Sequence, residues 1–374
     1  MQIKREIQDI LQKSLFQGRV VILYGARQVG KTTLVKNVMT EYREDALYLN
    51  CDEIDVRQAL TDKTSTELKA FIGDKRLVVI DEAQRVKNIG LTLKLLIDNF
   101  PNTQIIATGS SSFELSGKIK EPLTGRKTEF FLFPFSIKEL TQVRSPSEIK
   151  RSLEDLLIFG SYPGVFLASN EREKIVRELA TSYSYKDVLV YQDIRNPELL
   201  EKLLQALALQ IGSEVSYSEL AQLLGVNKIT IENYVRVLEQ AYIIFRVGPF
   251  SRNIRNELKK KRKIYFYDVG LRNALINNFN PLSLRQDVGA LWENFLVIER
   301  MKKNNNLEII NNIYFWRTTT GKEIDYIEEA DGVLTGYEFK WNKKTFIAPK
   351  EFLENYENSK VNLVNKDNFL DFIL

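Results

Sequence analysis

The chain has 374 residues, 44% of them hydrophobic and 27% charged, an ordinary globular balance in a chain too long for one typical core. The formal net charge is only +4, so the position of the charges matters more than their sum. One cysteine excludes an internal disulfide framework, and the absence of histidine leaves acid–base and metal chemistry to carboxylates, lysines, hydroxyls and water. We expect a cytoplasmic protein without membrane segments, because no apolar run approaches the ~18 residues that span a bilayer.

Residues 25–32, GARQVGKT, fit the pattern G-x-x-x-x-G-K-[ST] of the phosphate-binding P-loop. The run 19–24 predicts a buried strand before the loop, and 33–39 predict the start of a helix after it. Lys31 is expected to reach the β- and γ-phosphates of ATP, and the Thr32 hydroxyl to ligate Mg²⁺. The residues predicted to bind nucleotide are Gly25, Ala26, Arg27, Gln28, Val29, Gly30, Lys31, Thr32 and Thr33.

Four apolar residues, 77–80, lead into Asp81 and Glu82, which is the Walker B pattern. Such a strand is central in an α/β sheet, and its carboxyl end emerges at the edge where these sheets bind ligands. We therefore expect Asp81 to hold Mg²⁺, through water or through Thr32. Glu82 is expected to polarise the water that attacks the γ-phosphate.

Two further residues are candidates for the same reaction. An apolar strand at 104–107 ends in hydroxyls, and Ser110 is predicted to orient the attacking water or sense the γ-phosphate, although an ordinary Gly/Ser turn fits as well. Arg126 precedes a strand at 128–132. It is predicted to neutralise phosphate charge, in its own chain or on a neighbouring subunit of a homo-oligomer, with a solvated turn residue as the equal alternative.

These motifs resemble those of archaeal and bacterial P-loop ATPases related to the AAA+ class, which have an additional strand and a catalytic glutamate. The resemblance covers about residues 1–140. It implies a parallel sheet sandwiched by helices, in which the Ser110 strand separates the P-loop strand from the Walker B strand. The segments that carry it are 25–32, 81–84, 108–111, 123–126 and 133–136.

Residues 141–197 are predicted to form a helical lid, with a long helix at 171–192 as lid or oligomer contact. Residues 198–262 then show three helices followed by a strand, which resembles a winged helix-turn-helix. The presumed recognition helix carries two basic residues, Lys228 and Arg236, and two glutamates. Its charges therefore cancel, which is unfavourable for contacts with a phosphate backbone. A protein-contact module therefore fits this region as well as a DNA reader does.

Basic charge is concentrated directly after this helical region. Residues 251–263 carry seven basic side chains and one acidic side chain, a local charge of +6. Such a segment is typical of an arm that binds the nucleic-acid backbone. A solvated loop is the alternative.

The last predicted domain, 263–374, combines a helix at 288–303 with three strands at 313–317, 323–327 and 334–340. Glu338 and Lys340 share a strand face, and Asp325 lies on the neighbouring strand. The pattern resembles the PD-(D/E)XK nuclease fold, which is restriction-endonuclease-like, and the segment is similar to an uncharacterised C-terminal domain that accompanies this ATPase class.

The nuclease resemblance implies a set of site residues. Asp325 and Glu338 would bind Mg²⁺, Glu293 would complete the carboxylate set, and Lys340 would orient or activate water on a phosphodiester. The alternative is a half-buried hairpin with alternating polar residues.

The sequence thus predicts an α/β protein with a P-loop core at 1–140, a lid at 141–197, a winged helix with basic arm at 198–262, and a nuclease-like domain at 263–374. We expect a Mg²⁺-dependent ATPase whose turnover, from ATP to ADP, is coupled to modules that act on nucleic acid. The alternative function is a nucleotide-gated switch that binds DNA or protein and carries a catalytically dead nuclease fold.

Overall fold

The computed structural model describes residues 3–110, 119, 122–168, 170–182, 196–251, 262–318 and 320–374. It divides into two compact units. The N-terminal unit comprises residues 2–134 and 240–242, and the C-terminal unit comprises 135–239 and 243–374. Of the predicted features, the second half of the long helix at 171–192 and residues 252–261 of the basic arm lie outside the described residues.

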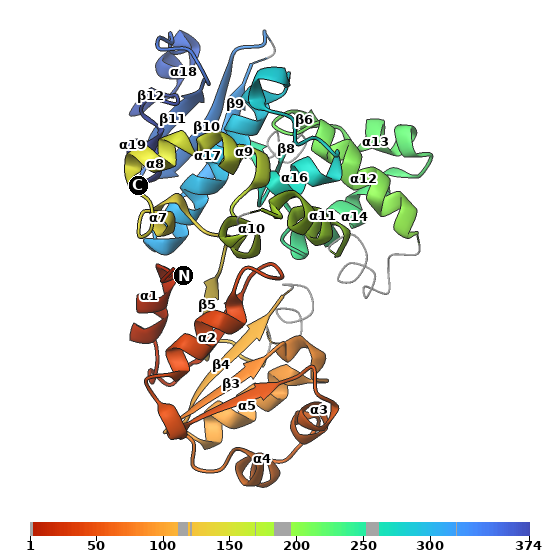
Figure 1. Cartoon of the computed structure of the whole chain (residues 1–374), viewed down its shortest axis with the longest axis vertical. Coiled ribbons are helices and arrows are strands. Elements are labelled where there is room, and N and C mark those ends of the chain that lie inside the picture. Colours follow the sequence, from red (N-terminus) through yellow and green to blue (C-terminus); the bar gives the residue numbers. More distant parts are fainter. Residues whose placement is uncertain are drawn as a thin grey trace. The chain divides into compact units, whose positions relative to one another are not determined.

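The N-terminal unit is built on a five-stranded parallel sheet, seen in Figure 1 with its helices around it. All residues of the first and third strands are buried, as expected for strands covered on both faces. The elements in chain order are α1 (Ile7–Lys13), β1 (Val20–Tyr24), α2 (Lys31–Met39), β2 (Ala46–Asn50), α3 (Ile54–Leu60), α4 (Ser65–Ile72), β3 (Leu77–Asp81), α5 (Ile89–Asn99), β4 (Gln104–Gly109) and β5 (Lys127–Phe131).

The strand order in this sheet is β2-β3-β4-β1-β5. The Ser110 strand, β4, therefore lies between the P-loop strand β1 and the Walker B strand β3, which confirms the order that the resemblance implied. Because all five strands are parallel, their carboxyl ends share one edge of the sheet. The P-loop, Asp81 and Ser110 all follow strands at that edge.

The C-terminal unit contains many short helices and a second sheet. Its helices are α7 (Ile137–Leu140), α8 (Pro146–Arg151), α9 (Leu153–Phe159), α10 (Pro163–Leu167), α11 (Arg172–Ser182), α12 (Pro197–Leu209), α13 (Tyr217–Leu224), α14 (Lys228–Gln240), α16 (Val269–Leu275), α17 (Val288–Asn306), α18 (Lys350–Asn355) and α19 (Phe369–Ile373). Its strands are β6 (Glu214–Val215), β7 (Ile244–Pro249), β8 (Arg262–Phe266), β9 (Asn312–Arg317), β10 (Glu323–Ala330), β11 (Val333–Phe339) and β12 (Ser359–Val364).

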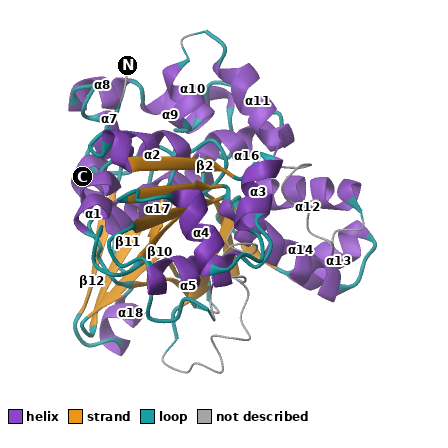
Figure 2. Ribbon diagram, turned by 90° about the horizontal axis from the view of Figure 1, so that it is seen from below, coloured by secondary structure: helices purple, strands orange, loops and turns teal. Residues whose placement is uncertain are grey.

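The second sheet has seven strands in the order β12-β11-β10-β9-β7-β8-β6. Strands β7, β8 and β6, which follow or separate the helices α12, α13 and α14, pair antiparallel with one another. Strand β7 also pairs in parallel with β9. The strands expected to form a wing and the strands expected to form a nuclease-like domain are therefore neighbours in one sheet. Figure 2 shows α12, α13 and α14 grouped together beside it.

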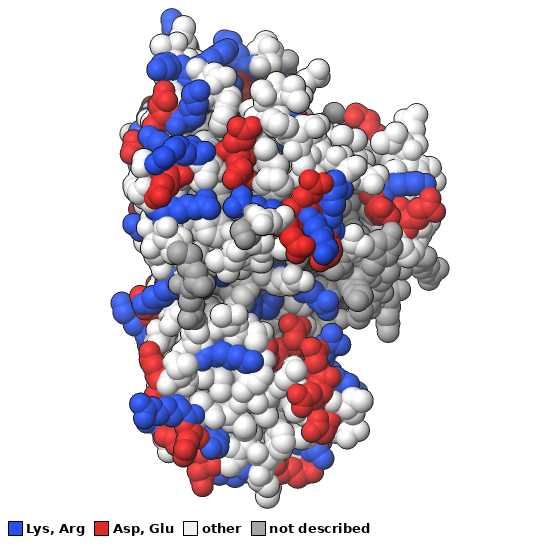
Figure 3. Space-filling view, in the orientation of Figure 1, with Lys and Arg blue, Asp and Glu red and all other residues white. Residues whose placement is uncertain are grey.

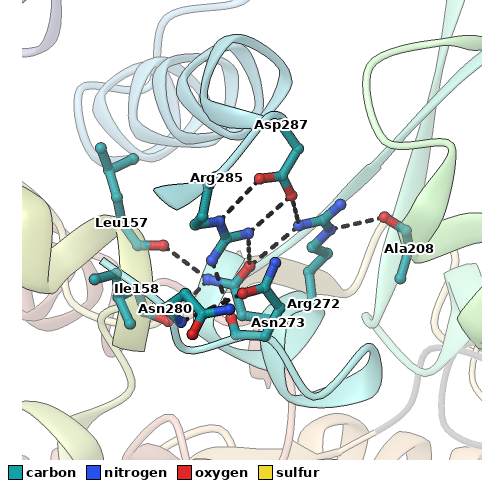
Figure 4. A network of polar contacts seen from close by, with 9 residues as sticks. Leu157, Ile158, Ala208, Arg272, Asn273, Asn280, Arg285 and Asp287 are labelled. Atoms are coloured by element: carbon teal, nitrogen blue, oxygen red, sulfur yellow. Dashed lines mark hydrogen bonds and ion pairs between the residues drawn. The ribbon is translucent and has the colours of Figure 1, made fainter. Parts of the chain in front are cut away.

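A buried polar network joins several helices of the C-terminal unit (Figure 4). Arg272, 1% exposed, donates to the carbonyl of Ala208 at 2.7 Å and pairs with Asp287. Arg285 donates to the same carboxylate at 2.8 Å and to the Asn273 side chain, which in turn donates to two carbonyls of α9. The network fixes α9, α12 and α16 to one another, because a buried donor left without its acceptor is costly.

None of the described helices is long and apolar enough to cross a membrane.

Candidate nucleotide site and a second polar pocket

The P-loop has the backbone that its glycines permit. Gly25 has a φ of 155°, and a Cβ atom there would lie 2.4 Å from the carbonyl oxygen of Leu132. Gly30 has a φ of 98° and directly precedes the first residue of α2. These conformations are open to glycine and strained for other residues, so the two motif glycines are required by local geometry. They place the loop at the amino end of α2, where anions are favoured.

Lys31, predicted to bind phosphate, lies within this loop. Its ammonium donates to the carbonyls of Gly25 at 2.8 Å and Ala26 at 2.9 Å, and the residue is 5% exposed. The loop carbonyls thus hold the positive charge beside the amino end of α2.

Thr32 and Asp81, the two predicted magnesium ligands of this unit, are in direct contact. The Thr32 hydroxyl donates to Asp81 Oδ2 at 2.7 Å. Two further hydroxyls, from Tyr48 on β2 and Thr108 on β4, also donate to the Asp81 carboxylate. Burial and the bond to Asp81 raise the pKa of Tyr48, which keeps it a donor. Sequence reasoning missed these two hydroxyls, because each reaches Asp81 from a different strand.

Glu82 and Ser110, predicted as base and sensor, are also brought together. The Ser110 hydroxyl donates to Glu82 Oε2 at 3.3 Å, and the Gln84 amide donates to the same oxygen at 2.5 Å and to Ser110 at 3.2 Å. Glu82 has a φ of 53°, and its backbone N–H donates to Thr108. A left-handed glutamate is strained, and such residues gather at functional sites.

Arg5 is a further residue of this site that sequence reasoning missed. Its guanidinium donates to the carbonyl of Val29 in the P-loop at 2.7 Å and to the carbonyl of Phe133 at 2.6 Å. The side chain is buried, with the residue 6% exposed. Arg5 therefore joins the segment before α1 to the P-loop and to the chain after β5.

Arg126 does not lie at this edge of the sheet. It directly precedes β5, its backbone carbonyl accepts from Val20 at the start of β1, and its side chain pairs with Asp98 at 2.7 Å. The P-loop follows the other end of β1, a strand length of roughly 15 Å away. The alternative in which Arg126 neutralises phosphates in its own chain is therefore wrong, whereas a role on a neighbouring subunit stays a prediction.

The charges near α14 are paired within the C-terminal unit. Lys228 pairs with Glu232 at 3.2 Å, and Arg236 donates to Asn233 at 3.1 Å. On the face drawn in Figure 3, acidic and basic side chains of the described residues are interspersed rather than gathered by sign. Lys263, counted in the basic arm, is 1% exposed on β8, so assigning it to an exposed arm was wrong.

The four predicted residues of the nuclease-like domain gather around one region of the second sheet. Asp325 on β10, Glu338 on β11 and Lys340 line an open pocket of about 610 Å³, with the segment 346–350 on its other side. Lys340 pairs with Glu338 at 2.6 Å. Glu293 on α17 lies behind the pocket wall and reaches this cluster through Lys263.

Lys263 is the centre of this cluster. Its ammonium lies 2.8 Å from Glu293, 2.5 Å from Glu323 and 3.9 Å from Asp325. Tyr265, also on β8, donates to the same Glu293 oxygen at 2.6 Å. The signal in the sequence was the period of two in the strand, which puts residues 263 and 265 on one face.

Burial raises the pKa of two carboxylates in this region, those of Glu293 and Glu338. It raises the pKa of Glu293 to about 7, although Lys263 opposes the shift. Burial, followed by the charge of Asp325, raises the pKa of Glu338 to about 7 as well. Glu338 Oε2 is buried and has no hydrogen-bond partner in the described part of the chain.

The predicted three-carboxylate metal centre does not form. Among the described residues, no three acidic or cysteine side chains stand together so that they could hold a metal ion. Glu293, assigned as the third ligand beside Asp325 and Glu338, is bound to the ammonium of Lys263 instead. These residues therefore do not fit the metal centre that a PD-(D/E)XK nuclease fold implies.

Family models match three successive segments of the chain. An AAA domain matches residues 17–141, and two domains of unknown function, DUF8612 and DUF4143, match residues 150–282 and 288–370. The N-terminal unit is thus similar to nucleotide-binding P-loop domains of the ATPase kind, in agreement with the motifs and the sheet order.

The chain is also similar to several full-length proteins. An uncharacterized protein of Mycobacterium tuberculosis is 29% identical over 343 residues, which cover 90% of this chain and 74% of the relative. One from Methanocaldococcus jannaschii is 25% identical, covering 94% and 83%, and one from Haemophilus influenzae is 24% identical, covering 84% and 81%. A solved structure of the Pif1 helicase from Candida albicans aligns over 48% of each chain with 15% identity and a TM-score of 0.25, too slight a likeness to indicate a common fold.

Proposed function

We propose that the chain is a Mg²⁺-dependent ATPase. The observation that carries this proposal is the arrangement at the sheet edge, where Thr32 donates to Asp81 at 2.7 Å and Ser110 donates to Glu82 at 3.3 Å, beside the P-loop. A hydroxyl and a carboxylate are the oxygen ligands that Mg²⁺ takes, so the donor set fits the metal. When bound there, Mg²⁺ supplies charge neutralisation for the β- and γ-phosphates.

The residues of the chain divide the remaining work. The P-loop N–H groups and the Lys31 ammonium bind the phosphates, for which Lys31 exchanges its bonds to the Gly25 and Ala26 carbonyls. The Glu82 carboxylate accepts a proton from the attacking water. Ser110 and Gln84 orient that carboxylate by donating to its Oε2 oxygen.

Two substitutions test this assignment. Lys31→Ala is expected to lose ATP binding. Glu82→Gln is expected to bind ATP but to hydrolyse it about 10²- to 10⁴-fold more slowly, because the amide cannot accept the proton. Glu44→Gln, the same change at an exposed position of this unit, is the control. Wild-type hydrolysis no faster than that of Glu82→Gln would overturn the assignment of the base.

We also propose that residues 197–266 form a winged helix that contacts nucleic acid through the basic arm. The order α12, β6, α13, α14, β7, β8, with the three strands antiparallel, supports this proposal. On α14, Lys228 is paired with Glu232, and this pairing favours the arm over the helix as the backbone contact. A protein partner at α14 is the alternative.

We propose that the C-terminal pocket binds nucleic acid but does not cleave it. Asp325, Glu338 and Lys340 share the pocket, as the nuclease resemblance requires, but Glu293 is bound to Lys263. The test incubates plasmid and linear single-stranded DNA with Mg²⁺ or Mn²⁺, with and without ATP, and compares the wild type with the Asp325→Ala, Lys340→Ala double variant. Equal or absent cleavage is expected. Cleavage by the wild type alone would restore the nuclease assignment.

A further inference from the structure

Lys263 is a buried cation at the place where a nuclease of this fold would collect its carboxylates. Its side chain is 2% exposed, and its ammonium contacts Glu293 and Glu323 directly. A third carboxylate, that of Asp325, lies 3.9 Å from the same ammonium, so three acidic side chains surround this one cation.

The backbone holds Lys263 in this position from both sides. Strand β8 pairs with β7, where Lys263 is opposite Val247, and with β6, where Lys263 is opposite Glu214. The side chain also passes over the ring of Phe315, with its ammonium 5.4 Å from the ring centre. A lysine on a strand paired along both edges has little freedom to withdraw from the carboxylates.

We propose that Lys263, buried beside two residues that line the pocket, is the resident cation of this region and that its ammonium keeps divalent metal ions away from Glu293, Glu323 and Asp325. The inference rests on the third proposed function, binding of nucleic acid at the C-terminal pocket without cleavage, and is independent of the ATPase. Two effects exclude the metal. The ammonium repels a second cation, and Lys263 together with Tyr265 occupies Glu293 Oε1.

The consequence is that one substitution should raise the affinity of this region for a divalent cation. In Lys263→Gln the three carboxylates lose the ammonium between them, whereas Tyr265 still donates to Glu293, so that Mn²⁺, an ion that oxygen ligands suit, meets less repulsion. Mn²⁺ binding is measured by titration calorimetry on the full chain, nucleotide-free, with Asp81→Asn in every sample to remove the N-terminal metal site. Lys263→Gln is expected to bind one Mn²⁺ at least 10-fold more tightly than the parent chain.

Two further variants keep the test decisive. Uncompensated buried carboxylates destabilise a protein, so Lys263→Gln is also combined with Glu323→Gln, which preserves the net charge. This double variant is expected to fold and to bind Mn²⁺ more tightly than the parent chain through the two carboxylates that remain, Glu293 and Asp325. Lys322→Gln removes a lysine of the pocket rim, 50% exposed and paired with Glu351, and is expected to gain nothing.

Each outcome bears on the proposal. Tighter Mn²⁺ binding in either Lys263 variant, absent in Lys322→Gln, supports it. The proposal is overturned if the parent chain already binds Mn²⁺ as tightly, if Lys322→Gln gains binding equally, or if both Lys263 variants fold and neither gains binding. A nuclease activity in the DNA assay would contradict binding without cleavage, whereas the calorimetry reports on metal exclusion alone.

Discussion

Arg5 offers the sharpest test of how the nucleotide site is held. Replacing it with methionine keeps an unbranched apolar stem but removes the guanidinium and its bonds to the Val29 and Phe133 carbonyls, at 2.7 and 2.6 Å. A hydrogen bond to a charged group contributes roughly 1.5–3 kcal/mol, and both carbonyls would lose a buried donor. We therefore expect Arg5→Met to lower the free energy of unfolding of the N-terminal unit by about 3 kcal/mol.

The same change should weaken nucleotide binding, because Val29 belongs to the P-loop. We expect the Kd for ATP to rise about 10-fold, which corresponds to roughly 1.4 kcal/mol of lost loop order. The rate at saturating ATP is expected to change less, since the carbonyls that Arg5 binds belong to Val29 and Phe133 and not to the proposed base Glu82. Lysine has a compact ammonium in place of the planar, forked guanidinium. The Kd of Arg5→Lys for ATP should therefore lie between the values of the wild type and of Arg5→Met.

The assay has to report on one unit at a time. The three tryptophans, at 292, 316 and 341, all lie in the C-terminal unit, so their fluorescence does not follow the other one. Hydrogen exchange of peptides within 20–39 in increasing urea gives the opening free energy of the P-loop region directly. Lys4→Met, which removes a neighbouring exposed cation, is the control and should cost less than about 0.5 kcal/mol. Equal effects of Arg5→Met and Lys4→Met would refute the reasoning.

Three other predictions concern charged residues of the chain. Arg126→Ala should abolish ATP hydrolysis without weakening ATP binding if Arg126 acts on a neighbouring subunit, and mixing it with Lys31→Ala protein should then restore activity; no recovery would count against a shared site. Burial raises the pKa of Asp287, but Arg285 and Arg272 lower it more, so that its pKa lies below the usual value. The ionised Asp287 therefore stabilises the folded protein above about pH 4, and this stabilisation is lost as the pH falls further. The melting temperature of Asp287→Asn should therefore fall less between about pH 4 and pH 2 than that of the wild type. Reversing the charges at 259–261 should lower DNA affinity and the slope of its salt dependence, and an unchanged salt titration would remove the arm from the interface.

The nucleotide site could be predicted because its main functional residues are contiguous in the sequence and lie at the ends of strands. The P-loop and the pair Asp81, Glu82 each need only a strand and the turn after it, and the parallel sheet brings those turns together. Arg5, Tyr48 and Thr108 could not be found in this way, because they are bound to the site through space and belong to no local pattern.

The positions of Arg126 and Lys263 in their sheets had signals that were available in the sequence. Arg126 precedes a strand parallel to β1, and a residue before such a strand lies at the edge opposite the P-loop. Lys263 ends a run of basic residues, yet it also begins the apolar stretch 264–266, where alternate residues face the carboxylates. The run of basic residues suggested that Lys263 belongs to the arm, whereas the period of two in the strand places its side chain on the buried face of β8.

The shared second sheet limits how this chain can be cut or recombined. Strand β7 is paired on one side with β8, next to the helices α12–α14, and on the other with β9, which leads through β10 to the pocket. A truncation between the two modules would strip β7 of one neighbour and leave a long bare edge ready to pair with other chains. The helical module and the pocket therefore share one sheet, and we expect fragments cut between β7 and β9 to aggregate rather than to fold as two separate domains.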